Sequence, residues 1–351
     1  MAEDRDSNGP RMPGWAIILI LLAGAIAFGV LLSTCELIAN AAEIVSQGPV
    51  QAIQPQIDDL RQQVEELKNR VDSLVHNRIP VKMEFCGETV PQERIHVRER
   101  LDKEVTLLSR KQFTLYIKRA TYKYFPYIEK RLKEWRMPDC LKYVAVIESA
   151  MLPNALSSAK AYGMWQFIPS TGRRYGLKQN SGIDERANFE KATDAAFTYL
   201  WDNCQIFKNL GAKNCWPLAM AAYNVGEAAV EKAVRQQRTT DFYNLWLPAE
   251  ETRQYVYRAI VAKLVMSDPK TFGLSLKDSD MYQWPDIKEV TIALAKPKSI
   301  INVTVSLGVS VPEFLLLNPQ YSIIAKGKKS KNNYTVLPKG TYKFKVPSRE
   351  E

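Results

Sequence analysis

Histidine is scarce in this chain. Only two of its 351 residues are histidines, His76 and His96, which argues against a histidine-ligated metal site and against a Ser/His/Asp triad. The five cysteines contain no C-x-x-C pair, which also argues against a zinc site. RNP-like motifs, zinc-finger spacings and glycine-rich phosphate loops are missing from the sequence, so nucleic acid is weakly supported as a partner. We expect no metal, no cofactor and no nucleic-acid partner.

The composition is that of a globular protein with an excess of positive charge. Hydrophobic residues make up 46 % of the chain, charged residues make up 25 %, and the formal net charge is +10. This charge favours an anionic partner, such as a membrane surface or an acidic polymer of the cell wall. The length suffices for two domains in addition to a membrane anchor.

An uncharged run near the N-terminus predicts a membrane anchor. Residues 14–35 read GWAIILILLAGAIAFGVLLSTC, which as a helix is long enough to span a bilayer core of roughly 30 Å. Arg5 and Arg11 precede the run. The positive-inside rule therefore predicts a cytoplasmic tail at 1–13 and a catalytic part in the periplasm, anchored in a bacterial inner membrane by a single span.

Two other interpretations of this run remain open. One is a cleaved signal peptide, although the run is long for that purpose. The other is a lipoprotein signal ending in L-S-T-C, which would be acylated at Cys35, although threonine before the cysteine fits such a signal poorly.

A heptad pattern follows the predicted span. Residues 36–55 are small and polar and predict a linker, whereas residues 56–77 predict a helix whose sequence IDDLRQQVEELKNRVDSL repeats in sevens. The first positions of the heptads are Ile57, Val64 and Val71, and the fourth positions are Leu60, Leu67 and Leu74. Branched residues alternating with leucine in this way favour a parallel two-stranded coiled coil, and so a homodimer. The alternative is a lone amphipathic helix that packs on its own domain.

The remaining chain predicts a mainly α protein with a small C-terminal module. Residues 78–99 form a connector that includes the strand-like VKMEF, and residues 100–272 show apolar spacing typical of helices. In residues 283–348 the pattern changes: KEVTIALA and YKFKV predict strands, while VTVSLGVS and VPEFLLLNP predict short helices. The result is a βααβ module.

Glu148 ends a nearly unbroken apolar run, KYVAVIES. On a helix, Leu141, Val144, Ala145 and Glu148 share one face. Burial would raise the pKa of such a carboxyl group above its reference of about 4.3, and a glutamic acid that keeps its proton near neutral pH can donate it to a leaving group. The alternative is that the helix ends at Ser149 and that Glu148 points into solvent.

Three further segments extend this pattern. After Glu148-Ser149 comes a loop, and then residues 163–166, Gly-Met-Trp-Gln, are expected to open a helix that Pro169 closes. Later, AMAAYNVG places Tyr223 and Asn224 near a helix end, and ETRQYVYR contains Glu251 and Tyr255.

These four segments, in this order, resemble the soluble-lytic-transglycosylase-like enzymes of glycoside hydrolase family 23, and most of all their membrane-bound type D branch. The resemblance covers about residues 110–265 and implies a goose-lysozyme-like α domain whose groove binds peptidoglycan glycan. Residues 283–348 resemble, more weakly, the LysM modules of that branch. Glu148 aligns with the family's single catalytic acid.

The resemblance also implies a substrate-assisted reaction. Glu148 would protonate the oxygen between N-acetylmuramic acid and N-acetylglucosamine, the substrate's acetamido group would stabilise the sugar cation, and Glu148 would then accept a proton from the C6 hydroxyl. The product would carry a 1,6-anhydro ring.

The substrate-binding residues that we expect are Ser157, Gly163, Met164, Gln166, Tyr223, Asn224 and Tyr255. Each also has a purely structural interpretation: a local turn for Ser157 and Gly163, a cap for Gln166 and Asn224, and core packing for Met164, for its neighbour Trp165 and for Tyr255. We expect Glu251 to be a first-turn carboxylate favoured by the helix dipole.

Two rival functions stay open. One is a wall-binding scaffold without activity. The other is a hydrolysing muramidase or chitinase, which needs a second carboxylate to activate water; Asp184 and Glu185 are the candidates.

The cysteines also allow a prediction. A periplasmic location permits disulfides. Cys204 and Cys215 bracket a loop between helices and are expected to pair, with buried free cysteines as the alternative. Cys86 and Cys140 are the remaining candidates.

Overall fold

The computed structural model describes residues 54–76, 79–107, 110–180, 182–321 and 335–348. The chain divides into two compact units, residues 1–73 and residues 74–351. The predicted tail at 1–13, the predicted span at 14–35 with Cys35, and most of the predicted linker lie outside the described residues.

Helix α3 (Gln54–His76) occupies the region of the heptads. It begins two residues before the predicted helix, inside the expected linker, and ends ahead of Pro80. Leu60 is 44 % exposed, and Val64 and Leu67 are also exposed. An exposed apolar stripe is what a coiled-coil seam presents in a single chain, and the homodimer stays a prediction.

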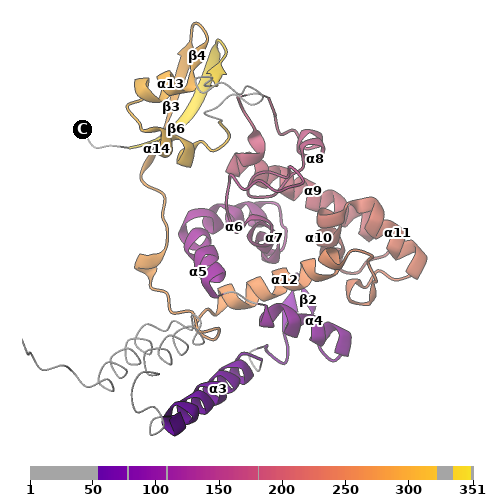
Figure 1. Ribbon diagram of the computed structural model, residues 1–351. Helices are drawn as coiled ribbons and strands as arrows, with labels where there is room; N and C mark the ends of the chain where they lie inside the picture. The colour runs from indigo at the N-terminus through magenta and orange to yellow at the C-terminus, as the bar shows by residue number, and fades with distance from the viewer. Residues whose placement is uncertain (1–53, 77–78, 108–109, 181, 322–334, 349–351) are drawn as a thin grey trace, which may run out of the picture. The chain divides into compact units, whose positions relative to one another are not determined.

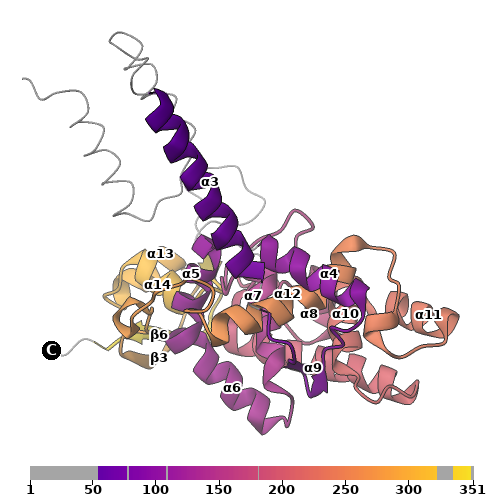
Figure 2. The same cartoon turned by 90° about the horizontal axis from the view of Figure 1, so that it is seen from below.

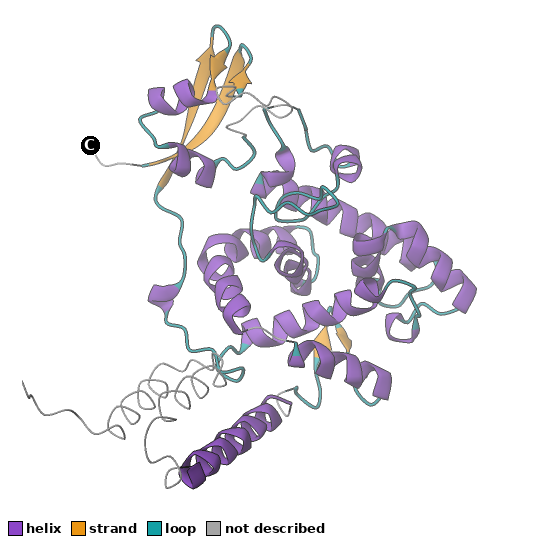
Figure 3. Cartoon of the chain, in the orientation of Figure 1, coloured by secondary structure: helices purple, strands orange, loops and turns teal. Residues whose placement is uncertain are grey.

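The second unit consists mainly of helices (Figure 3). In chain order they are α4 (Ile95–Thr106), α5 (Arg110–Arg119), α6 (Phe125–Glu134), α7 (Lys142–Ser149), α8 (Pro169–Arg174), α9 (Phe189–Asn209), α10 (Trp216–Val225), α11 (Glu227–Gln237) and α12 (Glu250–Ser267). Short 3-10 turns lie at Asp139–Leu141, Glu185–Ala187, Phe242–Asn244 and Asp278–Asp280. This confirms the mainly α prediction.

Helix α12 is central to this unit. It packs against α4, α7 and α10, and α10 in turn packs against α9 and α11 (Figures 1 and 2). The buried residues of α12 include Tyr255, Val256, Ala259 and Ile260. Because neighbours surround it, α12 carries apolar residues on several sides, and its sequence lacks the narrow stripe of a surface helix.

One helix in this unit contains a π-helical segment. α5 continues through Ala120–Tyr124, which is π-helical, into α6. Pro126 has no N–H and cannot donate to the carbonyl four residues earlier. The chain accommodates it with a wider turn, in which the N–H of Phe125 donates to the carbonyl of Ala120. Arg119, just before this turn, donates to the carbonyl of Ala150 at 3.0 Å, and so contacts the chain at the end of α7.

Several side chains within residues 79–99, which the sequence predicted to be a connector, pack into the core. Strands β1 (Glu84–Phe85) and β2 (Glu88–Thr89) form a hairpin, and Phe85, Val90 and Val97 are buried in the main core. The predicted strand VKMEF is thus reduced to two residues.

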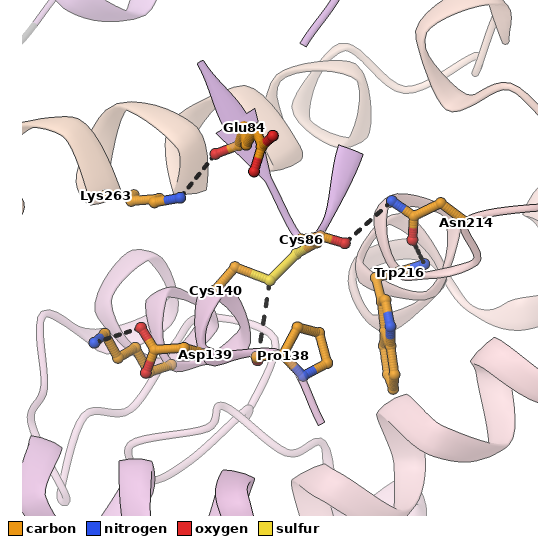
Figure 4. Close-up of a disulfide and its surroundings, with 9 residues drawn as sticks. Glu84, Cys86, Pro138, Asp139, Cys140, Asn214, Trp216 and Lys263 are labelled. Carbon is orange, nitrogen blue, oxygen red and sulfur yellow. Dashed lines mark hydrogen bonds and ion pairs between the residues drawn. A yellow bond between two sulfur atoms is a disulfide. The ribbon is translucent and has the colours of Figure 1, made fainter. Parts of the chain in front are cut away.

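A disulfide joins the hairpin to the turn before α7. Cys86 pairs with Cys140 (Figure 4). Asn214 donates to the carbonyl of Cys86 at 3.2 Å, and Lys263 donates to the carbonyl of Glu84 at 2.7 Å. These contacts connect the hairpin to three later segments of the domain.

A second disulfide joins Cys204 in α9 to Cys215, the residue before α10. This is the pairing that the sequence predicted. It closes the connection between two helices that pack against each other.

The C-terminal module has the predicted order of elements. Strand β3 (Ile287–Leu294) pairs antiparallel with β6 (Gly340–Pro347), and α13 (Ile300–Ser306) and α14 (Val311–Leu317) lie between them in the sequence. A short additional pair forms between β4 (Lys298–Ser299) and β5 (Val336–Leu337). The module has a small core of its own: Leu294, Ile300, Val303, Phe314, Tyr321, Leu337 and Phe344.

Within the described ranges, no single helix has both the length and the apolar character needed to cross a membrane. The pair α13 and α14, bent by 98°, meets both criteria when taken together.

Candidate active site

Glu148 lies in the last turn of α7. The helix ends after Ser149 because Ala150 and Met151 adopt left-handed backbone conformations, with φ of 55° and 61°. Tyr255 of α12 donates its hydroxyl to Glu148 Oε1 at 2.5 Å. Since α7 packs against α12, the carboxyl group is held between two helices that are distant in the sequence.

The surroundings of Glu148 shift its proton affinity. Burial raises the pKa of its carboxyl group to about 7; the hydrogen bond from Tyr255 lowers the pKa, and the negative charge of Glu251 raises it. The helix does end at Ser149, as the alternative had it, but Glu148 does not point freely into solvent, because its carboxyl group accepts a hydrogen bond from the hydroxyl of Tyr255. At neutral pH the group exists in both protonation states, as a proton donor and acceptor requires.

Two tyrosines near Glu148 remain protonated. Burial, followed by the negative charge of Glu148, raises the pKa of Tyr255 and of Tyr223 well above the ordinary value. Tyr223 donates to the carbonyl of Trp165 at 2.6 Å. We expected Tyr223 to bind substrate; in the structure its hydroxyl also fixes the loop that follows α7.

The prediction of a helix opened by Gly163 and closed by Pro169 is wrong. Residues 163–166 form a turn, in which Gln166 has a φ of 48°, and Pro169 begins α8. The proline fits the first turn of a helix because the missing N–H has no intrahelical partner there. Gln166 donates to the carbonyls of Ala155 and Gly163, at 3.0 and 2.7 Å, so its amide closes the turn.

Gly163 is required by the packing of this turn. Its φ is 91°, and a Cβ atom at this position would lie 1.8 Å from the carbonyl oxygen of Arg186. We predicted that Gly163 binds substrate; in the structure the backbone of Arg186 occupies the space next to it.

Met164 and Trp165 belong to the core. Both are almost completely buried, and the indole N–H of Trp165 donates to Thr193 at 3.0 Å. Ser157 accepts from the N–H of Ala161 at 3.0 Å, which is the local-turn alternative for that residue.

Asn224 lies at the end of α10, and its partner was not found from the sequence. The hydroxyl of Thr252 donates to Asn224 Oδ1 at 2.7 Å. This leaves the Asn224 amide nitrogen to donate elsewhere. Thr252 lies between Glu251 and Tyr255 in the ETRQY segment, and this position was the only feature of the sequence that could have indicated a role in the site.

A row of aromatic rings extends from Tyr223. The ring centroids of Tyr223 and Tyr199 lie 5.1 Å apart, and those of Tyr199 and Tyr175 lie 5.0 Å apart. Tyr175 and Tyr199 fall outside the four segments, and nothing in their spacing distinguished them from core aromatics.

Asp184 and Glu185 are engaged in structural ion pairs. Both oxygens of the buried Asp184 accept from Arg186, at 2.9 and 2.7 Å. The oxygens of Glu185 accept from the N–H of Lys178 at 2.8 Å and from the ammonium group of Lys191. Among the described residues, the carboxylate that acts on the pKa of Glu148 is Glu251, so neither candidate for a second catalytic carboxylate is coupled to the acid.

Comparison with known proteins finds relatives of the domain around Glu148. The family described as "Transglycosylase SLT domain" matches residues 125–246. Two curated relatives, both named membrane-bound lytic murein transglycosylase D, come from Escherichia coli strains K12 and CFT073. Each is 32 % identical over 219 residues, which are 58 % of this chain and 46 % of the relative. The chain thus spans about half the length of the curated relatives it matches.

Two solved structures are also similar. An inactive mutant of the lytic transglycosylase Slt from Pseudomonas aeruginosa matches with a TM-score of 0.32 and 22 % identity, over 44 % of this chain and 26 % of that one. The 70 kDa soluble lytic transglycosylase from Escherichia coli matches with a TM-score of 0.37 and 16 % identity, over 70 % and 51 %. The sequence matches show that residues 125–246 are similar to the transglycosylase SLT domain, and that 58 % of this chain is similar to membrane-bound lytic murein transglycosylase D.

Proposed function

We propose that this chain is a peptidoglycan lytic transglycosylase in which Glu148 acts first as acid and then as base. The observation that carries the proposal is the environment of Glu148: a desolvated carboxyl group with a pKa of about 7, oriented by Tyr255 within an SLT domain. A single carboxyl group that must both give and take a proton works best with a pKa near the ambient pH.

In the proposed reaction Glu148 gives up one proton in the first step and takes up another in the last step. Glu148 donates its proton to the oxygen that links N-acetylmuramic acid to N-acetylglucosamine. The bond between that oxygen and C1 of the N-acetylmuramic acid then breaks. The acetamido group of the substrate stabilises the cation at C1. The Glu148 carboxylate then accepts the proton of the C6 hydroxyl while O6 bonds to C1. The products are a free N-acetylglucosamine end and a 1,6-anhydro-muramic end, and Glu148 is protonated again.

The predicted substrate-binding residues divide by exposure. Ser157, Gln166, Tyr223 and Asn224 are partly exposed, and we assign contacts with the sugar to them. Gly163, Met164 and Tyr255 are buried, so we assign them an indirect role. Gly163 and Met164 hold the conformation of the turn, and Tyr255 orients the acid through its hydrogen bond.

Mass spectrometry of digested peptidoglycan tests the reaction. The chain without residues 1–53, incubated with purified murein, should release fragments that are lighter by one water than hydrolysed reducing ends. Reducing-end products would overturn the transglycosylase and favour the hydrolysing muramidase. In that case Glu251 would be the first carboxylate to examine, because it already acts on Glu148. No cleavage at all would favour the wall-binding scaffold.

We also propose a fold and a location for the parts around the domain. The catalytic part is goose-lysozyme-like, and residues 14–35 anchor it in the inner membrane with residues 36–351 in the periplasm. The relatives named membrane-bound lytic murein transglycosylase D support a membrane location. A reporter fused after Glu351 should be active only outside the cytoplasm, and activity inside would reject this topology. Palmitate labelling that is lost in Cys35→Ala would favour the lipoprotein.

The C-terminal module is proposed to be a LysM-like module that binds glycan. Its βααβ order and separate core support this assignment. With Glu148→Gln as the parent, removal of residues 283–348 should reduce sedimentation with murein sacculi. Unchanged sedimentation would leave the module without a sugar-binding role.

The heptads of α3 are proposed to form a parallel homodimer. The exposure of Leu60, Val64 and Leu67 supports this proposal, and confinement to a membrane would raise the effective concentration of the helices. Cysteines introduced at positions 60 or 67 should crosslink in membranes, and a lack of crosslinking would reject the dimer.

A further inference from the structure

A cavity of about 200 Å³ lies between α4, residues 242–247 and α12. Its lining includes three basic and three aromatic side chains: His96 and Arg100 from α4, Tyr243 and Trp246 from the connecting segment, and Arg253 and Tyr257 from α12. His96 and Arg100 are one helical turn apart, as are Arg253 and Tyr257, so each helix presents one continuous face to the cavity.

This cavity is separate from the site around Glu148. On α12, Tyr255 lies two residues from both Arg253 and Tyr257, and residues two apart on a helix point to nearly opposite sides. Tyr255 contacts Glu148, whereas Arg253 and Tyr257 line the cavity. One side of α12 therefore contacts the acid, and the opposite side lines the cavity.

Of the two arginines, Arg253 is already engaged. It bonds Glu250 through Nε and Nη2, and it donates through Nη1 to the carbonyls of Leu247 and Pro248. Its guanidinium carbon lies 4.2 Å from the centroid of the Trp246 ring. These contacts fix Arg253 as part of the wall and hold the Trp246 ring, which is 60 % exposed.

The positive charge of Arg100, unlike that of Arg253, is not balanced by a carboxylate of the described residues. Over the described ranges Arg100 forms no ion pair, and its hydrogen bond goes to the carbonyl of Arg253 at 3.3 Å. Its guanidinium carbon lies 5.8 Å from the centroid of Tyr257. A guanidinium group carries five N–H donors, so donors and a full positive charge remain for a ligand.

Tyr243 forms a buried part of the cavity wall. It is 5 % exposed, and its hydroxyl has no hydrogen-bond partner in the part of the chain that the structure describes. Native proteins seldom leave a buried hydroxyl unpaired, because its desolvation is then uncompensated. This hydroxyl is shielded from the cavity as well as from solvent, so the group in the cavity wall that offers a charge to a ligand is Arg100.

We propose that this cavity binds a carboxylate of a peptide-bearing glycan fragment, with Arg100 as the charge partner. The choice of ligand rests on the proposed function, because the stem peptides of peptidoglycan carry carboxylates next to a glycan. Arginine binds a carboxylate through two parallel N–H donors. The exposed Trp246 ring offers a flat surface to the apolar side of the same fragment.

Binding is measured by calorimetry in the Glu148→Gln protein, so that no fragment is cleaved. The probes are a disaccharide tripeptide with free carboxylates, the same fragment with its carboxylates amidated, the disaccharide without peptide, and inorganic phosphate. We expect the free-carboxylate fragment to bind most tightly, and Arg100→Gln to weaken it by roughly tenfold or more while leaving the other probes unchanged. Arg235→Gln removes an exposed arginine on α11 and should leave all four affinities unchanged.

Three results would overturn the proposal. The first is equal binding of the free and amidated fragments, which needs no variant and is independent of folding. The second is unchanged binding in Arg100→Gln. The third is phosphate bound as tightly as the fragment, which would make the cavity a general oxyanion site. Failure of the proposed function is seen separately, as a lack of cleavage by the protein that retains Glu148.

Discussion

The hydroxyl of Tyr255 donates to Glu148 Oε1 at 2.5 Å across 107 residues of sequence. This contact opposes the other influences on the acid. Burial and the charge of Glu251 raise the pKa of Glu148, the hydrogen bond lowers it, and the result is about 7. The protonated form, which the first step of the proposed reaction requires, is therefore lost as the pH rises through about 7.

Tyr255→Phe should move the alkaline limb of the pH profile to higher pH. The substitution removes a donor that stabilises the carboxylate, so the pKa of Glu148 rises, by about one unit for a hydrogen bond to a charged group. The measurement is kcat/KM for murein fragments between pH 5 and 9, which reports the pKa of the free enzyme.

Glu251→Gln is the matched control for this shift. Its carboxylate raises the pKa of Glu148 by repulsion, so its removal should move the same limb to lower pH. If both variants shifted the limb in the same direction, or if neither did, Glu148 would not be the group that titrates in the profile.

Glu148→Gln should make the protein more stable above neutral pH. The pKa of Glu148 is about 7 in the folded chain, against 4.5 as the reference value. Between these values the folded state binds more protons than the unfolded state, so the free energy of unfolding falls as the pH rises. Glutamine does not titrate, and the variant should gain up to about 3 kcal/mol at pH 8 and almost nothing at pH 4.

Urea unfolding at pH 4 and pH 8 measures this difference. Glu251→Gln, at an exposed position, should change the stability much less at both values. A gain in Glu148→Gln that did not depend on pH would show that desolvation of the charged carboxylate is not its cause.

Gly163→Ala should destabilise the domain by several kcal/mol. The new Cβ atom would lie 1.8 Å from the carbonyl oxygen of Arg186, and the φ of 91° is unfavourable for alanine. Gly176→Ala shares the positive φ, at 82°, but its Cβ atom would meet nothing within 4 Å. It should cost only about 1–2 kcal/mol of backbone strain. Thermal unfolding of the two variants separates the clash from the strain, and equal losses would contradict the clash.

Local patterns in the sequence predicted the end of α7, the end of α10 and the βααβ module. The helix boundaries in these segments depend on contacts between residues that are near in sequence, such as the capping box of Ser310 and Glu313 that starts α14, whereas β3 and β6 pair across the whole module. The same logic failed at Pro169, because proline favours the first turn of a helix as readily as it ends the preceding one.

Contacts between distant segments could not be predicted in this way. The carbonyl of Arg186 decides the conformation at Gly163, and Thr252 decides the orientation of Asn224. Neither partner is marked by periodicity or spacing. The site residues Glu148 and Tyr255 were found because the four segments occur together, whereas the cavity at Arg100 gave no signal in the sequence.

Glu148→Gln should abolish bond cleavage while glycan binding is retained. Glutamine has nearly the same shape and can still accept from Tyr255, but it can neither donate the proton to the leaving oxygen nor take one from the C6 hydroxyl. General acid–base catalysis contributes about 10²–10⁴-fold, so the turnover of murein should fall by at least this factor. The measurement is the release of fragments over time, together with sedimentation of the variant with murein sacculi.

Asp184→Asn separates this chemical role from a structural one. Asp184 neutralises the buried Arg186 through two hydrogen bonds, and loss of one partner of a buried ion pair costs about 3–5 kcal/mol. The variant should therefore unfold more easily, yet its folded fraction should cleave at a normal rate and give the same 1,6-anhydro ends. A folded Asp184→Asn protein without activity would return this carboxylate to the mechanism, and full activity in Glu148→Gln would remove Glu148 from it.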